Sequence, residues 1–177
     1  MLQTEESLLI VIDMQEKLIQ VMDNKERLIG NISKLVRGIK TLGIPIIVTE
    51  QVKLGPTIPE LSECLTDITP ITKASFSCCG NEEFTRALNA VNRKQILLAG
   101  IESHVCVYQT AADLLSMDYE VYLVVDAVSS RTAENREICI QRMDHMGIIP
   151  VSTEMVLFEL LKTAEDEHFK DISKIVK

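Results

Sequence analysis

The sequence ILLAGIESHVCVYQTAADLLSM, residues 96–117, indicates the class of fold that this chain adopts. It begins with a continuous apolar run, residues 96–99, which ends at Gly100. A run this apolar is typical of a strand that is buried on both faces of a parallel sheet. The segment that follows, residues 104–117, is apolar and rich in alanine, which indicates a buried helix. A buried strand that leads into a buried helix is the repeating unit of an α/β fold.

The same alternation extends over the rest of the chain. Four more apolar runs are predicted as strands: residues 8–12, 44–48, 121–125 and 148–151. Five more segments have helical periodicity: residues 26–42, 82–91, 132–146, 156–161 and 169–176. This order predicts a three-layer α/β fold, a doubly wound, mostly parallel sheet of Rossmann-like type with helices on both faces. Residues 1–177 are predicted to form a single domain.

One stretch, residues 51–77, interrupts this rhythm. It contains Pro56, Pro59 and Pro70, and we expect it to be a long loop. A loop of that length inside a compact domain usually has a function, and an ordinary surface excursion is the alternative. We expect it to supply walls of a binding pocket.

The composition restricts the class of protein. Hydrophobic residues make up 46% of the chain, aromatic residues 4%, and tryptophan is absent, so the core must be aliphatic. The formal net charge of −8 argues against binding to nucleic acid or to an anionic membrane. No segment approaches the roughly 20 apolar residues needed to span a bilayer, and residues 1–7 lack the features of a signal peptide.

The cysteines and the hydropathy lead to two further expectations. The chain has five cysteines at irregular spacings, which argues against a disulfide framework and favours a reducing, cytoplasmic location. The mean hydropathy of +0.15 is high for an acidic chain of this size. It predicts apolar surface that is buried between subunits, so we expect a homo-oligomer, at least a dimer.

Polar residues follow the predicted strands at the place where a ligand would bind. In open α/β sheets, ligands bind outside the carboxyl ends of the strands. The first four runs are followed by Asp13, by Glu50 and Gln51, by the turn before Cys106, and by Asp126. Cys106 falls near the start of a predicted helix, where the helix dipole would lower the pKa of the thiol. The backbone N–H groups of the same turn could form an oxyanion hole.

Each of these residues also has an ordinary structural explanation. A cysteine in an apolar helix, such as Cys106, is usually a small buried hydrophobe. An aspartate that ends a strand, such as Asp13, is often a turn or cap residue. A lysine such as Lys73 is normally solvated. Taken one by one, the three residues therefore do not identify an active site.

Three motifs, in order along the chain, favour a functional interpretation. They are Asp13-Met14-Gln15, Thr72-Lys73-Ala74-Ser75-Phe76 and Gly100-Ile101-Glu102-Ser103-His104-Val105-Cys106-Val107. With these motifs the chain resembles the isochorismatase-like cysteine hydrolases over almost its whole length. Segments at 50–57, 126–131 and 169–173 resemble one branch of that superfamily, the isochorismatase domain-containing proteins.

The resemblance implies a catalytic triad of Asp13, Lys73 and Cys106. In it, the thiol attacks a carbonyl carbon, the aspartate transfers the proton and the lysine stabilises both negative charges. The resemblance also implies a cis peptide bond between Ile101 and Glu102, and an oxyanion hole made by the amides of Glu102 and Cys106. The implied activity is cleavage of a small-molecule amide, carbamoyl or ester bond through a thioester, with no cofactor.

Two departures from the wider superfamily narrow the implied activity. Metal-binding nicotinamidases have an aspartate and several histidines after the second strand, whereas residues 50–60 contain no histidine. The histidines of this chain, His104, His145 and His168, are widely scattered, so we expect no metal. Enzymes that cleave the vinyl ether of isochorismate lack the nucleophilic cysteine, which this chain has as Cys106.

Two other functions stay open. The first is a protein that binds a small molecule or another protein on the same fold without turnover. The second is vinyl ether hydrolysis, in which Asp13 would act alone and Cys106 would be dispensable.

Several residues near the motifs are candidates for substrate binding. They are Gln15, Gln51, Phe76, Ser103 and His104. The two glutamines could equally satisfy the backbone of a loop, and His104 could be a solvated residue at the start of a helix. Arg131 could bind an acid group of the substrate or have a structural role at the start of a helix.

Overall fold

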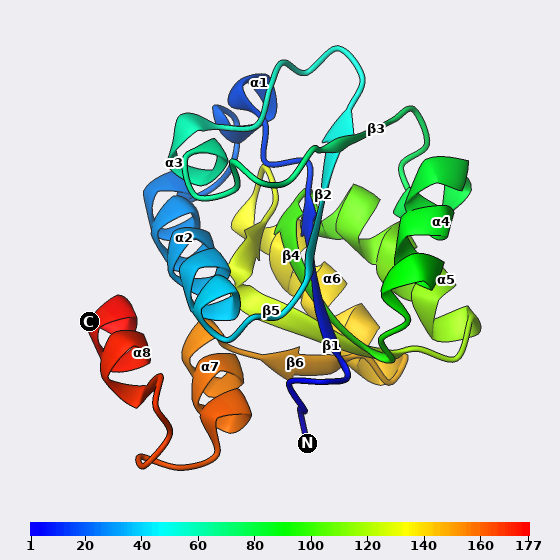
Figure 1. The fold of residues 1–177 in the computed structure, drawn as a ribbon. Helices are drawn as coiled ribbons and strands as arrows, with labels where there is room; N and C mark the ends of the chain where they lie inside the picture. Colours follow the sequence, from blue (N-terminus) through cyan, green and yellow to red (C-terminus); the bar gives the residue numbers. More distant parts are fainter.

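Six strands form one sheet in the order β3-β2-β1-β4-β5-β6 (Figure 1). The computed structural model describes all residues from 1 to 177. The strands are β1 (Ser7–Ile12), β2 (Ile46–Gln51), β3 (Ile71–Lys73), β4 (Gln95–Ile101), β5 (Glu120–Ser129) and β6 (Ile149–Val151). Every neighbouring pair is parallel, which confirms the predicted doubly wound α/β fold. The strand order reverses between β1 and β4, and ligands of such sheets bind at this reversal.

Helices cover both faces of the sheet (Figure 1). They are α1 (Glu16–Ile19), α2 (Lys25–Thr41), α3 (Pro59–Ser62), α4 (Glu82–Val91), α5 (Tyr108–Ser116), α6 (Ala133–His145), α7 (Thr153–Leu161) and α8 (Phe169–Val176). A 3-10 turn at Cys78–Gly80 precedes α4, and a π-helical turn at Ser103–Val107 leads into α5. Helices α2, α7 and α8 lie on one face of the sheet, and α4, α5 and α6 on the other. None of these helices has the length and apolar character needed to cross a membrane.

The continuous apolar runs are explained by two separate cores. In β1, Leu9 and Val11 pack into the core on the side of α2 and α7. Leu8, Ile10 and Ile12 pack into the other core, with α4 and α5. Side chains of a strand alternate between the faces of a sheet, so a strand covered on both sides must be apolar at every position.

Two strands extend three or more residues beyond their predicted carboxyl ends. β2 extends to Gln51 instead of ending at residue 48, and β5 extends to Ser129. Asp126 therefore lies inside β5, and the expectation that it follows the strand is wrong. Its Oδ1 accepts hydrogen bonds from the N–H (2.8 Å) and the hydroxyl (3.0 Å) of Thr153, the first residue of α7. Asp126 thus stabilises the start of α7, next to the carboxyl end of β6.

The predicted long loop, residues 51–77, contains two regular elements that the sequence did not reveal. These are the short helix α3 and the edge strand β3, which pairs with β2 so that Lys73 lies beside Gln51. A strand of three residues with an exposed middle residue has too few apolar positions to show a pattern. Its existence depends on pairing with β2, and that pairing places Lys73 at the carboxyl edge of the sheet.

Gly100 allows β1 and β4 to come together next to that edge. Its φ of +115° lies in a region that side chains rarely adopt, and a Cβ there would overlap the backbone of Ile12. The residue after Ile12 is Asp13, which itself has a positive φ of 51°. Gly100 thus sets the close approach of the two strands from which the site is built.

Candidate active site

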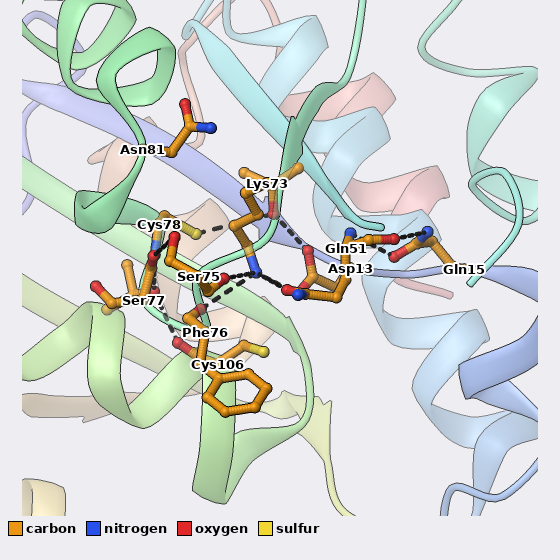
Figure 2. A network of polar contacts seen from close by, with 12 residues as sticks. Asp13, Gln15, Gln51, Lys73, Ser75, Phe76, Ser77, Cys78, Asn81 and Cys106 are labelled. Atoms are coloured by element: carbon orange, nitrogen blue, oxygen red, sulfur yellow. Dashed lines mark hydrogen bonds and ion pairs between the residues drawn. The ribbon is translucent and has the colours of Figure 1, made fainter. Parts of the chain in front are cut away.

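Three side chains from separate elements meet at the carboxyl edge of the sheet (Figure 2). Asp13 follows β1, Lys73 ends β3, and Cys106 lies in the turn after β4. Lys73 Nζ is 2.7 Å from Asp13 Oδ2, and both side chains are fully buried. The charges of Asp13 and Lys73 both act on the pKa of the Cys106 thiol, which lies beside this pair. The structure thus brings together the three residues of the implied triad.

The ammonium group of Lys73 has no hydrogen left to donate. It contacts four acceptors: Asp13 Oδ2 at 2.7 Å, Gln51 Oε1 at 2.7 Å, and the carbonyl oxygens of Phe76 at 3.1 Å and Ser75 at 3.2 Å. An ammonium group has three N–H bonds. Lys73 is therefore a fixed cation, and this dense set of partners offsets the cost of burying its charge.

The carboxylate of Asp13 is held at both oxygens. Oδ2 accepts from Lys73, and Oδ1 accepts from the hydroxyl of Thr49 at 2.8 Å. Asp13 is completely buried, as is Thr49. Two donors on opposite oxygens restrict rotation of the carboxylate. The sequence did not single out Thr49, although it directly follows the second predicted strand.

The thiol of Cys106 does not have the lowered pKa expected of a cysteine near a helix start. Burial raises its pKa to about 12, and the negative charge of Asp13 acts in the same direction, while Lys73 opposes both. Cys106 lies inside a buried π-helical turn. There the loss of hydration disfavours the thiolate more than the helix dipole favours it. The thiol is therefore neutral at neutral pH, with a carboxylate beside it.

The turn before Cys106 has an unusual backbone. The peptide bond between Ile101 and Glu102 is cis. The backbone N–H of Glu102 has no hydrogen-bond acceptor within the chain. The Glu102 carboxylate accepts from Arg131 Nε at 2.8 Å, and 59% of the Arg131 side chain is exposed. Arg131 thus stabilises this turn through an ion pair. This contact was not part of either predicted role, binding of a substrate acid group or a structural role at a helix start.

Three of the five candidates for substrate binding have other contacts. The amide of Gln15 donates to the carbonyls of Gln51 and Gly55 and accepts from the N–H of Gln51, so it is used up in the loop after β2. The hydroxyl of Ser103 is buried and donates to Ser129 O at 2.7 Å. These contacts favour the loop-backbone role of Gln15 and bury the Ser103 hydroxyl inside the fold, and substrate binding by either residue stays a prediction.

The amide of Gln51 is also bonded within the chain. Its Oε1 accepts from Lys73, and its Nε2 donates to the carbonyl of Ala74 at 2.8 Å. Gln51 therefore contacts the triad instead of presenting its amide to a substrate. The other two candidates have accessible side chains: Phe76 is 55% exposed, and His104 is half-buried with Nδ1 2.9 Å from the hydroxyl of Ser130. Substrate binding by Phe76 and His104 stays a prediction.

No three histidine, cysteine, aspartate or glutamate side chains gather as a set of metal ligands. All five cysteines are free.

Known proteins are similar to this chain over nearly its full length. A family model described as the isochorismatase domain matches residues 7–155. The chain is 36% identical over 177 residues to isochorismatase domain-containing protein 2 of Danio rerio, covering 99% of this chain and 89% of that protein. It is 38% identical over 177 residues to the secreted isochorismatase effector Isc1 of Phytophthora sojae, covering 97% and 84%.

Solved structures share the fold. The MAR1 ribonuclease of Caenorhabditis elegans matches with a TM-score of 0.93 at 34% identity, covering 99% of this chain and 91% of that one. The YcaC protein of Escherichia coli, described as an octameric hydrolase of unknown specificity, matches at 0.90 and 22% identity, covering 99% and 94%. A pyrazinamidase/nicotinamidase of Streptococcus mutans matches at 0.74 and 17%, covering 82% and 99%. The last two likenesses concern the fold alone.

Proposed function

Because this chain belongs to the isochorismatase family, a family of hydrolases, we propose that it is a cysteine hydrolase with Cys106 as its nucleophile. The observation that carries the proposal is the buried ion pair between Lys73 and Asp13 beside the Cys106 thiol. A buried charge pair next to a potential nucleophile, at the carboxyl edge of a doubly wound sheet, favours a catalytic site. The proposed reaction is cleavage of a small-molecule amide, carbamoyl or ester bond, without a metal or another cofactor.

The first half of the reaction forms a thioester. The Cys106 sulfur attacks the carbonyl carbon of the substrate while its proton passes to the Asp13 carboxylate. The free N–H of Glu102 and that of Cys106 donate to the oxygen that becomes negatively charged. The bond to the leaving nitrogen or oxygen then breaks, and that atom takes the proton from Asp13.

The second half returns the enzyme to its starting state. Asp13 accepts a proton from a water molecule, whose oxygen attacks the thioester carbon. The Cys106 sulfur leaves and takes the proton back from Asp13. Lys73 has no free N–H in this scheme, so it donates no proton and acts through its charge, which favours the carboxylate before proton transfer and the thiolate during it.

A screen of small amides, carbamoyl compounds and esters tests the proposal. Wild type and Cys106→Ala are assayed in parallel, and the intact mass of the protein is measured during turnover to detect an acyl group. Cys64→Ala is the matched control, because this free cysteine lies after α3, away from the triad. We expect turnover and an acyl adduct in wild type and Cys64→Ala, and loss of both in Cys106→Ala.

Other outcomes favour the alternatives. Turnover of a vinyl ether that survives in Cys106→Ala but not in Asp13→Asn would indicate ether hydrolysis. Saturable binding without turnover of any compound would indicate a binding protein. An RNA oligonucleotide belongs in the screen, because a structure 34% identical to this chain is described as a ribonuclease. We expect no cleavage of RNA, because the chain carries a net charge of −8 and Lys73, the cation at the centre of the site, is buried.

We also propose that the chain forms a homo-oligomer. An octameric protein shares its fold. Several large apolar side chains are exposed on the isolated chain, among them Phe76 next to the site at 55%.

A further inference from the structure

Two residues at the carboxyl end of β2 contact the Asp13–Lys73 ion pair. The proposed reaction assigns neither of them a step. Thr49 and Gln51 are two positions apart on the strand, so their side chains lie on the same face of the sheet. Glu50, between them, points to the opposite face, where its carboxylate accepts from the N–H and the hydroxyl of Thr57 at 2.7 Å each. The strand thus directs alternate side chains to the triad and to the loop behind it.

Thr49 contacts the carboxylate of the pair. Its hydroxyl donates to Asp13 Oδ1 at 2.8 Å, on the oxygen that Lys73 leaves free. The backbone repeats the connection, because the N–H of Asp13 donates to the carbonyl of Thr49 at 3.1 Å. On the other side, the thiol of Cys78 lies 3.8 Å from the same hydroxyl, and burial raises the pKa of that thiol to about 11. A neutral thiol can donate to the Thr49 oxygen, which leaves the Thr49 proton for Asp13.

Gln51 contacts the cation of the pair. Its Oε1 accepts from Lys73 Nζ at 2.7 Å, the same distance as the Asp13 contact. Its Nε2 donates to Ala74 O, and its backbone is bound on both sides by Gln15. Gln51 is thus held at its side chain and its backbone (Figure 2), so its oxygen is a fixed acceptor for Lys73.

We propose that Thr49 and Gln51 are positioning residues that keep the Asp13–Lys73 pair aligned on Cys106, a role that rests on the proposed function. Thr49 withdraws negative charge from Asp13 through its hydrogen bond, and Gln51 supplies a neutral acceptor that adds no charge against the thiol. The titratable groups around the two residues are Asp13, Lys73, Cys78 and Cys106.

The hydroxyl of Thr49 is tested by Thr49→Val, which keeps the shape and removes the donor, and by Thr49→Ser, which restores the donor. The rate at which iodoacetamide alkylates Cys106 is followed against pH by mass spectrometry of the Cys106 peptide, so no substrate is needed. Without the Thr49 hydrogen bond, Asp13 presents more negative charge to the thiol. We expect the curve of Thr49→Val to move to higher pH by about half a unit, a roughly threefold lower rate at a given alkaline pH. Thr49→Ser should return the curve to its wild-type position.

The control for Thr49 is Thr72→Val. Thr72 lies on β3 next to Lys73, but its side chain is exposed and points away from the pair. Its curve should coincide with that of wild type. A wild-type curve in a folded Thr49→Val protein, judged by circular dichroism at each pH, overturns the role of Thr49.

Gln51 is tested by Gln51→Glu, which places a second carboxylate against Lys73. The added negative charge should move the alkylation curve to higher pH by about one unit. Gln20→Glu adds the same charge at the exposed end of α1 and should leave the curve in place. If Gln51→Glu does not fold, Gln51→Met removes the acceptor without a charge, and Lys73 should then shift and change the alkylation rate. An unmoved curve in the folded variant overturns the role of Gln51.

The alkylation experiments can fail or succeed independently of the proposed hydrolase activity. If no compound acylates Cys106, the hydrolase proposal fails, and the alkylation curves still report whether Thr49 and Gln51 act on the thiol. If a substrate is found, Thr49→Val should lower kcat at unchanged KM, because Thr49 is completely buried and its hydroxyl contacts the side chains of Asp13 and Cys78. A change in KM alone would contradict a positioning role.

Discussion

Cys106 lies next to a charge pair that is neutral as a whole. The carboxylate of Asp13 disfavours the thiolate, Lys73 favours it, and burial decides the balance in favour of the protonated thiol. A protonated thiol beside a fixed carboxylate suits an attack in which the proton leaves as the new bond forms. The thiolate fraction in the resting protein is then small, so oxidants and electrophiles react with it slowly.

The state of this thiol leads to a prediction about pH. With a pKa raised to about 12, most of the thiol is protonated below that pH, and its small thiolate fraction increases throughout the alkaline range. We expect the alkylation rate of Cys106 to keep rising beyond about pH 10, whereas an ordinary cysteine levels off above its pKa near 8.5. In Asp13→Asn, the loss of the negative charge should move the curve to lower pH. A plateau of the wild-type rate at neutral pH would show that the thiol is ionised in the resting protein.

The ion pair itself can be measured through stability. Asp13→Asn or Lys73→Met leaves one buried charge without its partner and should lower the free energy of unfolding by about 3–5 kcal/mol. The double variant removes both charges, so its loss should be clearly smaller than the sum of the two single losses. Urea denaturation of the four proteins gives the coupling energy. Additive losses would mean that the two charges do not stabilise each other.

Among the elements, the four neighbouring strands β3, β2, β1 and β4 each deliver one part of the site. Lys73 comes from β3, Thr49 and Gln51 from β2, Asp13 from the end of β1, and the turn with Cys106 from the end of β4. Parallel strands have their carboxyl ends at the same edge, so this arrangement follows from the topology. The geometry of the site then depends on how closely β1 and β4 approach each other.

Gly100 allows that close approach. Two alanine substitutions separate the steric effect at Gly100 from the effect on stability of replacing a glycine elsewhere. Gly100→Ala introduces a Cβ that overlaps the backbone of Ile12 at a positive φ, so we expect a loss of stability of more than about 2 kcal/mol. Gly30→Ala, in α2, has open space around its Cβ and should stabilise by about 0.5–1 kcal/mol. Thermal unfolding of both variants tests this. Equal shifts in Tm would contradict the close approach of β1 and β4.

In the molecule as a whole, the two cores hold the aliphatic side chains, yet several large apolar side chains stay outside them. Three of these are Ile138 of α6, Ile149 of β6 and Met155 of α7, which are 56%, 42% and 55% exposed. They come from an edge strand and from the helices before and after it. An edge strand with apolar neighbours is a surface that another subunit can cover.

The oligomer prediction follows from these residues. Light scattering at micromolar concentration should give a mass well above the 19.9 kDa of one chain. The variant Ile149→Lys/Met155→Lys should shift the mass toward one chain if this surface forms an interface, because charges at an apolar contact repel and lose water. The matched control Glu154→Lys, at an exposed position between them, should keep the wild-type mass. A sample with the mass of a single chain would contradict the oligomer.

The expectations that held rest on local patterns, and those that failed depend on contacts between distant residues. Apolar runs report burial on both faces, so most strands and the class of fold could be predicted from residues close together in the chain, and the motifs around Asp13, Lys73 and Cys106 were visible in the same way. β3 could not be predicted, because three residues form a strand only when β2 pairs with them. The Thr49 contact joins residues 36 positions apart, and the Lys73–Asp13 pair spans 60. The pKa of Cys106 is raised, whereas its position near a helix start predicted a lowered pKa. The burial and the nearby charges that raise it come from segments that only the fold brings together.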